Sequence, residues 1–300
     1  MSEKPLTGTG KITCSEDLQK IFLPLNEGKG TAYERFALNK FLEKLVKRFP
    51  IKTVLELPAD GIMGLPGLKS FILASQGCEV TLANPSDKAL AEMKMLWDSL
   101  GRQAQFVQAG FEKTDFADQS FDLVWNFCVF ERFKKPELVV AEMCRLAKKY
   151  VLIEIQNVFN VGTFLHKSWH SFKREAWDHG EIAKMNWKTP AAMLKQNGFK
   201  IKEVGGTDLP PWPDINMKFT LKEEKADLSD YCEEFRLLRP GVKTREIEEI
   251  AKIWREKSYP STYPAWMNIL KWWYYLVEIP APQWFKILVS HHPYVIGERV

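Results

Sequence analysis

The chain has 300 residues, of which 45% are hydrophobic and 27% charged, a composition typical of a soluble globular protein and not of a disordered or fibrous one. Its 42 basic and 38 acidic residues leave a net charge of only +4, so we expect no nucleic-acid partner. The five cysteines are scattered and include no CxxC pair, which excludes a cysteine-rich zinc motif and favours a reducing compartment.

The first predicted element is an amphipathic helix that begins at Thr31 and ends before Pro50. Thr31 and Glu34 have the spacing of a capping box, and apolar residues recur after them at helical intervals. The polar residues before this helix lack the apolar core of a secretory signal. No window offers the roughly 20 uncharged apolar residues of a membrane-spanning helix. We therefore expect a cytoplasmic protein.

Strands and helices alternate after this first helix. Short buried strands are predicted over 53–57, 79–83, 105–109, 121–127 and 150–155, with helices over 68–76, 87–100 and 136–148 between them. A helix that ends at Asn197 and Gly198 leads to a sixth strand over 199–204, and a seventh is predicted over 291–300. The series predicts an α/β fold with a doubly wound, mostly parallel, seven-stranded sheet. Ligands of such sheets bind at the carboxyl ends of the strands.

The composition also suggests how the chain is divided. We predict an N-terminal leader and helix over 1–50, an α/β core over 51–206, and a last core strand over 291–300. The segment 207–290 between them is predicted to be a helical, aromatic-rich cap inserted before the last strand. Within it, a helix is indicated by a stripe of apolar residues at helical spacing, Ile247, Ile250, Ala251 and Trp254.

Four stretches of the core carry a family resemblance. They are 54–57 with the glycine-bearing loop after it, 78–86, 116–125, and the Glu-Met-Cys-Arg run 142–145. In this order they resemble class I S-adenosylmethionine-dependent methyltransferases, over about residues 53–204. The resemblance implies a Rossmann-like methyltransferase fold and S-adenosylmethionine as the cofactor. It also implies that a methyl group is transferred to an acceptor.

Three positions depart from the family pattern. Pro58 stands where glycine usually follows the first strand, Asn84 where an acidic residue closes the second strand, and Gly110 where an aspartate follows the third. An amide accepts hydrogen bonds from ribose hydroxyls more weakly than a carboxylate, by about 1 kcal/mol. We therefore expect weakened cofactor binding. Alternatively, the glycine-bearing loop after the first strand is a tight turn that binds no ligand, and the protein is a non-catalytic binding protein that has lost the cofactor.

The resemblance implies a set of cofactor-binding residues at the ends of the first four strands. They are Glu56, Leu57, Pro58, Ala59, Asp60, Gly61, Asn84, Pro85, Gly110, Phe111 and Asn126.

Three histidines are the candidate catalytic residues. His166 and His170 are four residues apart and so share one face of a helix predicted over 163–173, and His179 follows in the next loop. One of them would act as a general base or orient the substrate. Alternatively, they form hydrogen bonds between the cap and the sheet. A metal site would need a further ligand at recognisable spacing, so we predict none.

The acceptor is predicted to contact Trp212 and Asp214, in a stiff proline-rich segment, and Glu131, beyond the fourth strand. The segment could equally be a rigid linker, and Glu131 part of a surface ion pair. The aromatic stretch 263–285 favours a hydrophobic substrate pocket, peripheral contact with a membrane, or packing of the cap.

These observations together predict methyl transfer from S-adenosylmethionine to a small, partly hydrophobic acceptor. The alternatives are the non-catalytic binding protein and a membrane-surface scaffold. The sequence indicates neither the acceptor nor the oligomeric state.

Overall fold

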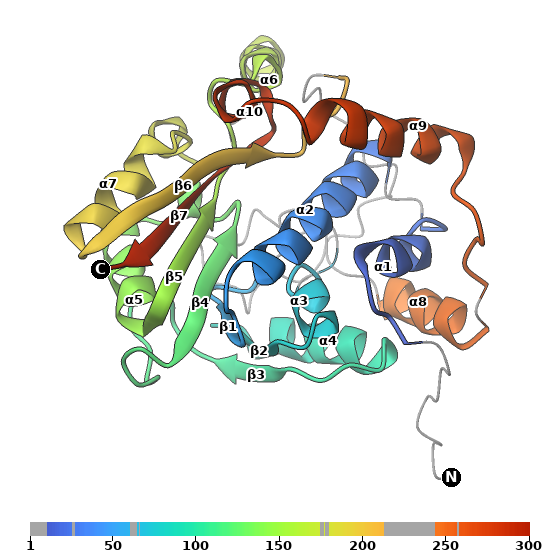
Figure 1. The fold of residues 1–300 in the computed structure, drawn as a ribbon, viewed down its shortest axis with the longest axis horizontal. Helices are drawn as coiled ribbons and strands as arrows, with labels where there is room; N and C mark the ends of the chain where they lie inside the picture. The colour runs from blue at the N-terminus through green and yellow to red at the C-terminus, as the bar shows by residue number, and fades with distance from the viewer. Residues whose placement is uncertain are drawn as a thin grey trace.

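The protein is described by a computed structural model that covers residues 11–25, 28–60, 65, 67–174, 177, 180–212, 244–256 and 258–300. Seven strands form one sheet in the order β3-β2-β1-β4-β5-β7-β6 (Figure 1). Neighbouring strands from β3 to β5 are parallel, whereas β7 is antiparallel to both β5 and β6. This confirms the predicted fold class. The strands are β1 Thr53–Glu56, β2 Glu79–Asn84, β3 Gln105–Gln108, β4 Phe121–Phe127, β5 Ala147–Glu154, β6 Phe199–Thr207 and β7 His292–Arg299.

Helices cover both faces of the sheet because successive strand residues point to opposite sides. Val54 and Leu123 belong to one apolar cluster, while their neighbours Leu55 and Val124 belong to the other. The first face is covered by α1 Ser15–Phe22, α2 Lys29–Arg48, α3 Phe71–Ser75 and α4 Asp87–Ser99. The second is covered by α5 Pro136–Leu146 and α7 Lys188–Gln196.

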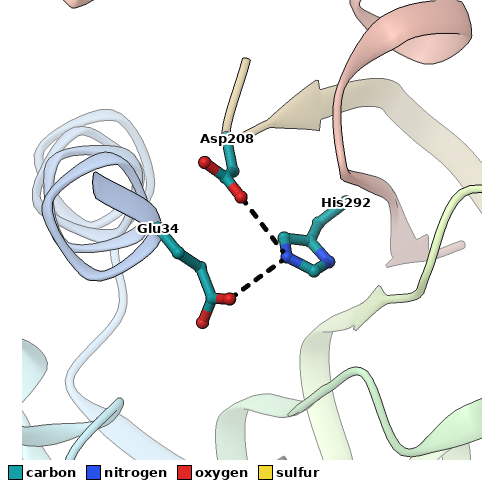
Figure 2. A group of neighbouring side chains, drawn as sticks. All are labelled: Glu34, Asp208 and His292. Atoms are coloured by element: carbon teal, nitrogen blue, oxygen red, sulfur yellow. Dashed lines mark ion pairs between the residues drawn. The ribbon is translucent and has the colours of Figure 1, made fainter. Parts of the chain in front are cut away.

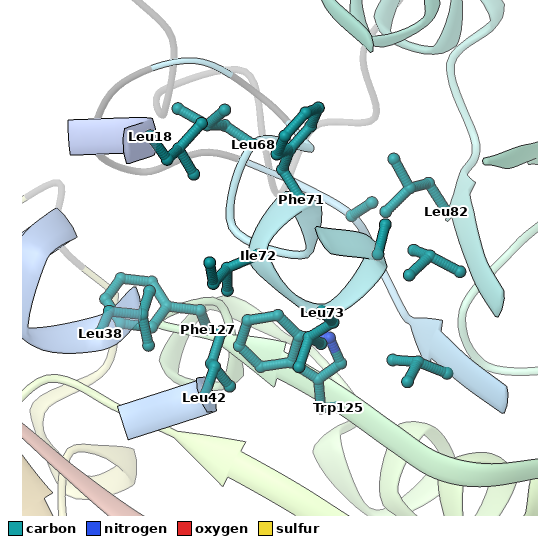
Figure 3. Close-up of a cluster of buried hydrophobic side chains, with 14 of the residues drawn as sticks. Leu18, Leu38, Leu42, Leu68, Phe71, Ile72, Leu73, Leu82, Trp125 and Phe127 are labelled. Carbon is teal, nitrogen blue, oxygen red and sulfur yellow. The ribbon is translucent and has the colours of Figure 1, made fainter. Parts of the chain in front are cut away.

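The first apolar cluster fixes α2 and α3 over the centre of the sheet. Leu38 and Leu42 of α2 and Ile72 of α3 gather around Trp125 and Phe127 of β4 (Figure 3). All five side chains are at most 2% exposed. The middle of α2 is therefore held close to the carboxyl end of β4.

Helix α2 begins earlier than the sequence predicts. Its N-cap is Gly28, so Thr31 and Glu34 lie inside the helix and the predicted capping box is wrong. The Glu34 side chain is 4% exposed and its carboxylate faces His292 of β7, an interaction that local sequence patterns do not reveal.

The described helices of the segment 207–290 pack against different parts of the molecule. Helix α8, Thr244–Glu256, packs against α4 and α1, and its predicted stripe is buried. Helix α9, Ala265–Trp273, packs against α2, and α10, Gln283–Val289, packs against β6. A π-helical turn, Tyr274–Glu278, joins α9 to the chain leading to α10. The N-terminal helix is tied to this segment by Glu16, whose carboxylate lies 3.0 Å from the Lys271 ammonium.

The remaining elements are connections near the sheet edge. They are the short 3-10 turns η1 Phe130–Arg132 and η2 Ile182–Lys184, and the helix α6 Val161–Lys173. Among the described helices, none combines the length and the apolar character that crossing a bilayer requires.

Candidate functional site

The chain leaving β1 continues between the neighbouring strands instead of turning away from the sheet. The Leu57 amide donates to the Trp125 carbonyl at 2.9 Å, and the Ala59 amide donates to the Ala83 carbonyl at 2.7 Å. Leu57, Ala59 and Asp60 are buried. This segment therefore lies at the carboxyl edge of the sheet, where the sequence places the cofactor.

Asn84, at the end of β2, uses both halves of its amide within the protein. Its Nδ2 donates to the Ala59 carbonyl at 2.7 Å, and its Oδ1 accepts the Ser86 amide at 2.9 Å. The sequence predicts a weak acceptor for ribose hydroxyls at this position. The structure adds that this acceptor is already engaged, in a bond that ties β2 to the loop after β1.

Two other predicted cofactor residues offer buried oxygens without a hydrogen-bond partner. Glu56 Oε2 accepts the Ser70 hydroxyl at 2.5 Å, while Glu56 Oε1 has no partner in the described structure. Asn126 Nδ2 donates to the Leu57 carbonyl at 3.2 Å, and Asn126 Oδ1 is likewise without a partner. Burial raises the pKa of Glu56 to about 7, against the opposing effect of Ser70 and Lys69.

The remaining predicted cofactor residues lie around this edge. The Pro85 carbonyl accepts from the Gln108 side chain at 3.2 Å, and Phe111 is buried with its ring 5.2 Å from that of Phe133. A methyl group on Gly110 would meet only the Lys113 carbonyl, at an ordinary 3.5 Å. Gly61 lies outside the described residues.

A second group of buried polar side chains lies at the same edge, toward β5, β7 and β6. His292 opens β7, Asp208 follows β6, and Glu34 reaches over from α2 (Figure 2). His292 Nε2 lies 3.5 Å from Glu34 Oε2 and 3.5 Å from Asp208 Oδ2. Its other ring nitrogen, Nδ1, lies 3.0 Å from the Cys128 sulfur. We refer to Glu34, Asp208 and His292 as the carboxylate–histidine cluster.

Neighbouring residues support the carboxylate–histidine cluster. Asp208 Oδ2 lies 3.0 Å from Nδ1 of His291. Glu154, at the end of β5, is fully buried; its Oε1 accepts the Thr207 hydroxyl, and its Oε2 has no partner among the described residues. Burial raises the pKa of Glu154 to about 8, although Thr207 and His292 act in the opposite direction. Burial disfavours a charge on His292, but Cys128 and Glu34 hold its pKa well above the usual value.

Glu131, predicted to bind the acceptor, is fully buried in η1, so its alternative role in a surface ion pair is wrong. Burial raises the pKa of Glu131 to about 7. Trp212 packs edge-on against Tyr33, with ring centroids 6.3 Å apart. Asp214 lies outside the described residues.

The candidate catalytic histidines occupy a different segment from the carboxylate–histidine cluster. His166 and His170 are on α6, as the sequence predicts, and the His170 ring packs edge-on against Trp177 at 5.6 Å. His179 lies outside the described residues. Sequence reasoning missed the cluster itself. The signals available were the His291-His292 pair at the start of the last strand and the lone Glu154 that ends an apolar run.

Two cavities lie near the carboxylate–histidine cluster. One, of about 140 Å³, lies between α2, β6 and the π-helical turn; no residue of the cluster lines it, but Thr207, whose hydroxyl donates to Glu154, does. The other, of about 20 Å³, is lined in part by Glu34, Asn39 and Lys69 and has room for about one water molecule.

The comparisons with known proteins concern part of the chain. Residues 63–153 match the sequence model of a family described as a methyltransferase domain. The matched part of the chain is a methyltransferase domain. The matched range runs from the loop after β1 to β5 and includes five of the eleven predicted cofactor residues, those from Asn84 to Asn126. S-adenosylmethionine is the cofactor of such methyltransferase domains, as the sequence resemblance implies. No curated protein matches the chain.

Solved structures of methyltransferases are similar to the chain at low identity. An S-adenosylmethionine-dependent methyltransferase from Aquifex aeolicus is 16% identical, covers 64% of this chain and 92% of its own, and has a TM-score of 0.43. Magnesium protoporphyrin IX methyltransferase from Synechocystis PCC 6803, solved with bound S-adenosylhomocysteine, is 18% identical, with 66% and 89% covered and a TM-score of 0.47. Since these scores are below 0.5, the methyltransferase assignment rests on the sequence match and not on these structures.

Proposed function

We propose that the protein transfers a methyl group from S-adenosylmethionine to a small, partly hydrophobic acceptor. The observation that carries the proposal is the methyltransferase-domain match over residues 63–153. Bound S-adenosylmethionine supplies a methyl group already activated by the positive sulfur. The protein's own task is then to align the acceptor with that methyl group and to exclude water.

The residues at the carboxyl edge of β1 and β4 fit part of this cofactor. Glu56 Oε1 and Asn126 Oδ1 are buried acceptors without partners, which suits the ammonium and hydroxyl donors of the cofactor. Asn84 suits it less well, because accepting a ribose hydroxyl would displace the Ser86 amide from Oδ1. We therefore expect binding that is weaker than in family members with an acidic residue there.

The acceptor side of the proposal is supported by an exposed apolar surface on α6, α9 and α10. These three helices lie along one side of the molecule (Figure 1). Large side chains on these helices and on the π-helical turn after α9 are exposed to between 36% and 79%: Val161, Phe164, Leu165, Phe172, Ile269, Trp272, Tyr275, Leu276, Trp284, Phe285 and Leu288. We call this set the aromatic face. A surface of this kind suits a lipophilic acceptor, or peripheral contact with the lipid layer that carries one.

The aromatic stretch 263–285 therefore divides between two of its predicted roles. Met267, Leu270 and Tyr274 are buried against Tyr33 and Phe36 of α2, so one side of the stretch is core. The opposite side belongs to the aromatic face. A membrane-surface scaffold without catalysis would use that face alone and leave the carboxyl edge of the sheet without a role.

Calorimetric titration with S-adenosylmethionine and S-adenosylhomocysteine tests the proposal. At pH 8, where the Glu56 carboxyl with its pKa of about 7 is mostly ionised, we expect both to bind the wild type, and Glu56→Gln to weaken binding at least about tenfold because a charged acceptor is replaced by a neutral one. Glu79→Gln, an exposed glutamate at the opposite end of β2, is the matched control and should bind as the wild type does. The absence of heat and of a thermal shift with either ligand would favour the non-catalytic binding protein.

The second experiment measures transfer. The protein is incubated with S-adenosylmethionine carrying a deuterated methyl group and with fractions of small lipophilic molecules, which are then analysed by mass spectrometry. A product heavier by the labelled methyl group identifies the acceptor. Binding of the cofactor without any labelled product from lipophilic or polar fractions would contradict catalysis.

A further inference from the structure

The carboxylate–histidine cluster is a polar site that methyl transfer does not by itself require. Glu34, Asp208 and His292 are 4%, 3% and 8% exposed and come from α2, the end of β6 and the start of β7. They have ligand atoms within 4.8 Å of one another. Carboxylates removed from water to this extent are retained when a cation or strong hydrogen bonds compensate them.

The distances within the cluster suit a shared cation better than direct hydrogen bonds. Charged N–H···O hydrogen bonds are about 2.7–2.9 Å long, whereas both carboxylates lie 3.5 Å from His292 Nε2. Two ligand atoms held by one metal ion, with bonds of about 2.1 Å at a tetrahedral angle, are about 3.4 Å apart. The two observed separations match that edge.

The Cys128 sulfur orients His292 as a metal-ligating histidine is oriented. The Nδ1 atom lies 3.0 Å from that sulfur, so Nδ1–H can donate to it while Nε2 faces the two carboxylates. In the neutral ring the Nε2 lone pair points at these carboxylates, and the repulsion is relieved by a cation, which is either a proton on Nε2 or a metal ion between the three groups. Metal-ligating histidines are oriented in this way by a partner on the second ring nitrogen.

A separate observation comes from Glu154. This carboxylate is fully buried, and its Oε2 has no hydrogen-bond partner among the residues that the structure covers. Its charge interacts with His292, Glu34 and Asp208, which places it beside them. The other oxygen is held by Thr207, the residue before Asp208. An unpartnered carboxylate oxygen beside three candidate ligands indicates a position for a metal ion or a metal-bound water.

We propose that Glu34, Asp208 and His292 bind one divalent metal ion, with Glu154 as the acceptor for a water molecule on the metal. One imidazole nitrogen and two carboxylate oxygens suit a borderline ion such as Zn²⁺, and three protein ligands leave a coordination position open. His291 acts as a positioning residue, since its Nδ1 contacts Asp208 Oδ2 at 3.0 Å. The proposal replaces the sequence expectation of no metal site.

The open position gives the metal a chemical role that rests on the proposed function. The cluster lies at the carboxyl edge, and Cys128 is two residues beyond Asn126 of the predicted cofactor site. A metal ion there would bind an acceptor oxygen and favour its deprotonated, nucleophilic form. Metal binding itself requires neither S-adenosylmethionine nor an acceptor, so the two proposals fail independently.

Metal content of the tag-free full-length protein tests the site. After chelation and dialysis against low-micromolar Zn²⁺, elemental analysis should find about one zinc per chain. Substituting Co²⁺ should give visible d–d absorption bands from the bound ion. Glu34→Gln, Asp208→Asn and His292→Asn should each lower the affinity at least about tenfold, with unchanged far-ultraviolet circular dichroism.

Glu43→Gln is the matched control. Glu43 lies on the same helix as Glu34 and is also buried, but its carboxylate binds Ser15 and lies outside the cluster. This variant should keep the metal and the cobalt spectrum. The proposal is overturned if the folded wild type retains no Zn²⁺ or Co²⁺. It is also overturned if Glu34→Gln and Glu43→Gln retain the same amount, since the cluster would then be joined by a proton on His292 and not by a metal.

Discussion

Glu56 should make the protein less stable as the pH rises, and Glu56→Gln should remove that effect. Burial raises the pKa of this carboxyl from its ordinary 4.5 to about 7. Between these values the folded protein holds a proton that the unfolded chain releases, so raising the pH favours unfolding. Stability from this group is therefore fully present below pH 4.5 and decreases as the pH rises toward and past 7.

The size of the effect follows from the pKa difference. One pKa unit corresponds to about 1.4 kcal/mol, and integrating from pH 5 to pH 8 gives about 2 kcal/mol for this group. Glutamine resembles the protonated carboxyl and still accepts the Ser70 hydroxyl. We thus expect Glu56→Gln to match the wild type in unfolding free energy at pH 5 and to exceed it by about 2 kcal/mol at pH 8.

Urea unfolding followed by tryptophan fluorescence at several pH values measures this difference. The other carboxyls with a raised pKa, Glu131, Glu154 and Glu278, affect both proteins alike and cancel in the comparison. Glu79→Gln, exposed at the start of β2, should follow the wild type throughout. Parallel stability profiles for wild type and Glu56→Gln would refute the reasoning, because Glu56 would then ionise in the folded protein as it does in the unfolded chain.

Two further predictions concern the cofactor edge and the aromatic face. Asn84→Asp leaves the Ala59 carbonyl without its hydrogen-bond donor, so the free energy of unfolding should fall by about 1–3 kcal/mol. The control Asn197→Asp loses a less buried side-chain hydrogen bond, so its free energy of unfolding should fall by less than about 1 kcal/mol. Equal losses in the two variants would show that Asn84 does not stabilise the loop after β1. Replacing Trp272 and Trp284 by alanine should abolish co-sedimentation with vesicles of phosphatidylcholine and phosphatidylglycerol, yet change stability by less than about 0.5 kcal/mol, since both are about two-thirds exposed. Undiminished vesicle binding would exclude the aromatic face as the contact.

The sheet could be predicted from the sequence because its signals are local. Short apolar runs such as 121–127 reappear as strands with almost the same ends, since strands buried on both faces need continuous apolar sequence. The predicted ends of helices are less accurate, because they depend on which residue caps the helix. The predicted start of α2 at Thr31 is wrong because the chain enters the helix at Gly28.

Only the cofactor edge of the candidate site could be predicted, because the other part of the site has no local sequence signal. The cofactor edge follows from motifs within one stretch of chain, and the family match covers most of that stretch. The carboxylate–histidine cluster has no local motif, because Glu34, Asp208 and His292 meet only after the sheet has formed. The sequence alone indicates Glu34 only as the capping-box partner of Thr31, and His292 only as a residue of the strand predicted over 291–300.

The cluster joins a helix made early in synthesis to the last strand of the chain. His292 opens β7, which follows β5 and β6 in the chain and inserts between them in the sheet. While the protein is being translated, β5 and β6 thus lack the strand that separates them, and Glu34 has no imidazole to face. The cluster can be assembled only once β7 has left the ribosome, so chains that stop before β7 should lack the cluster and should depend on chaperones to shield the unpaired strand edges.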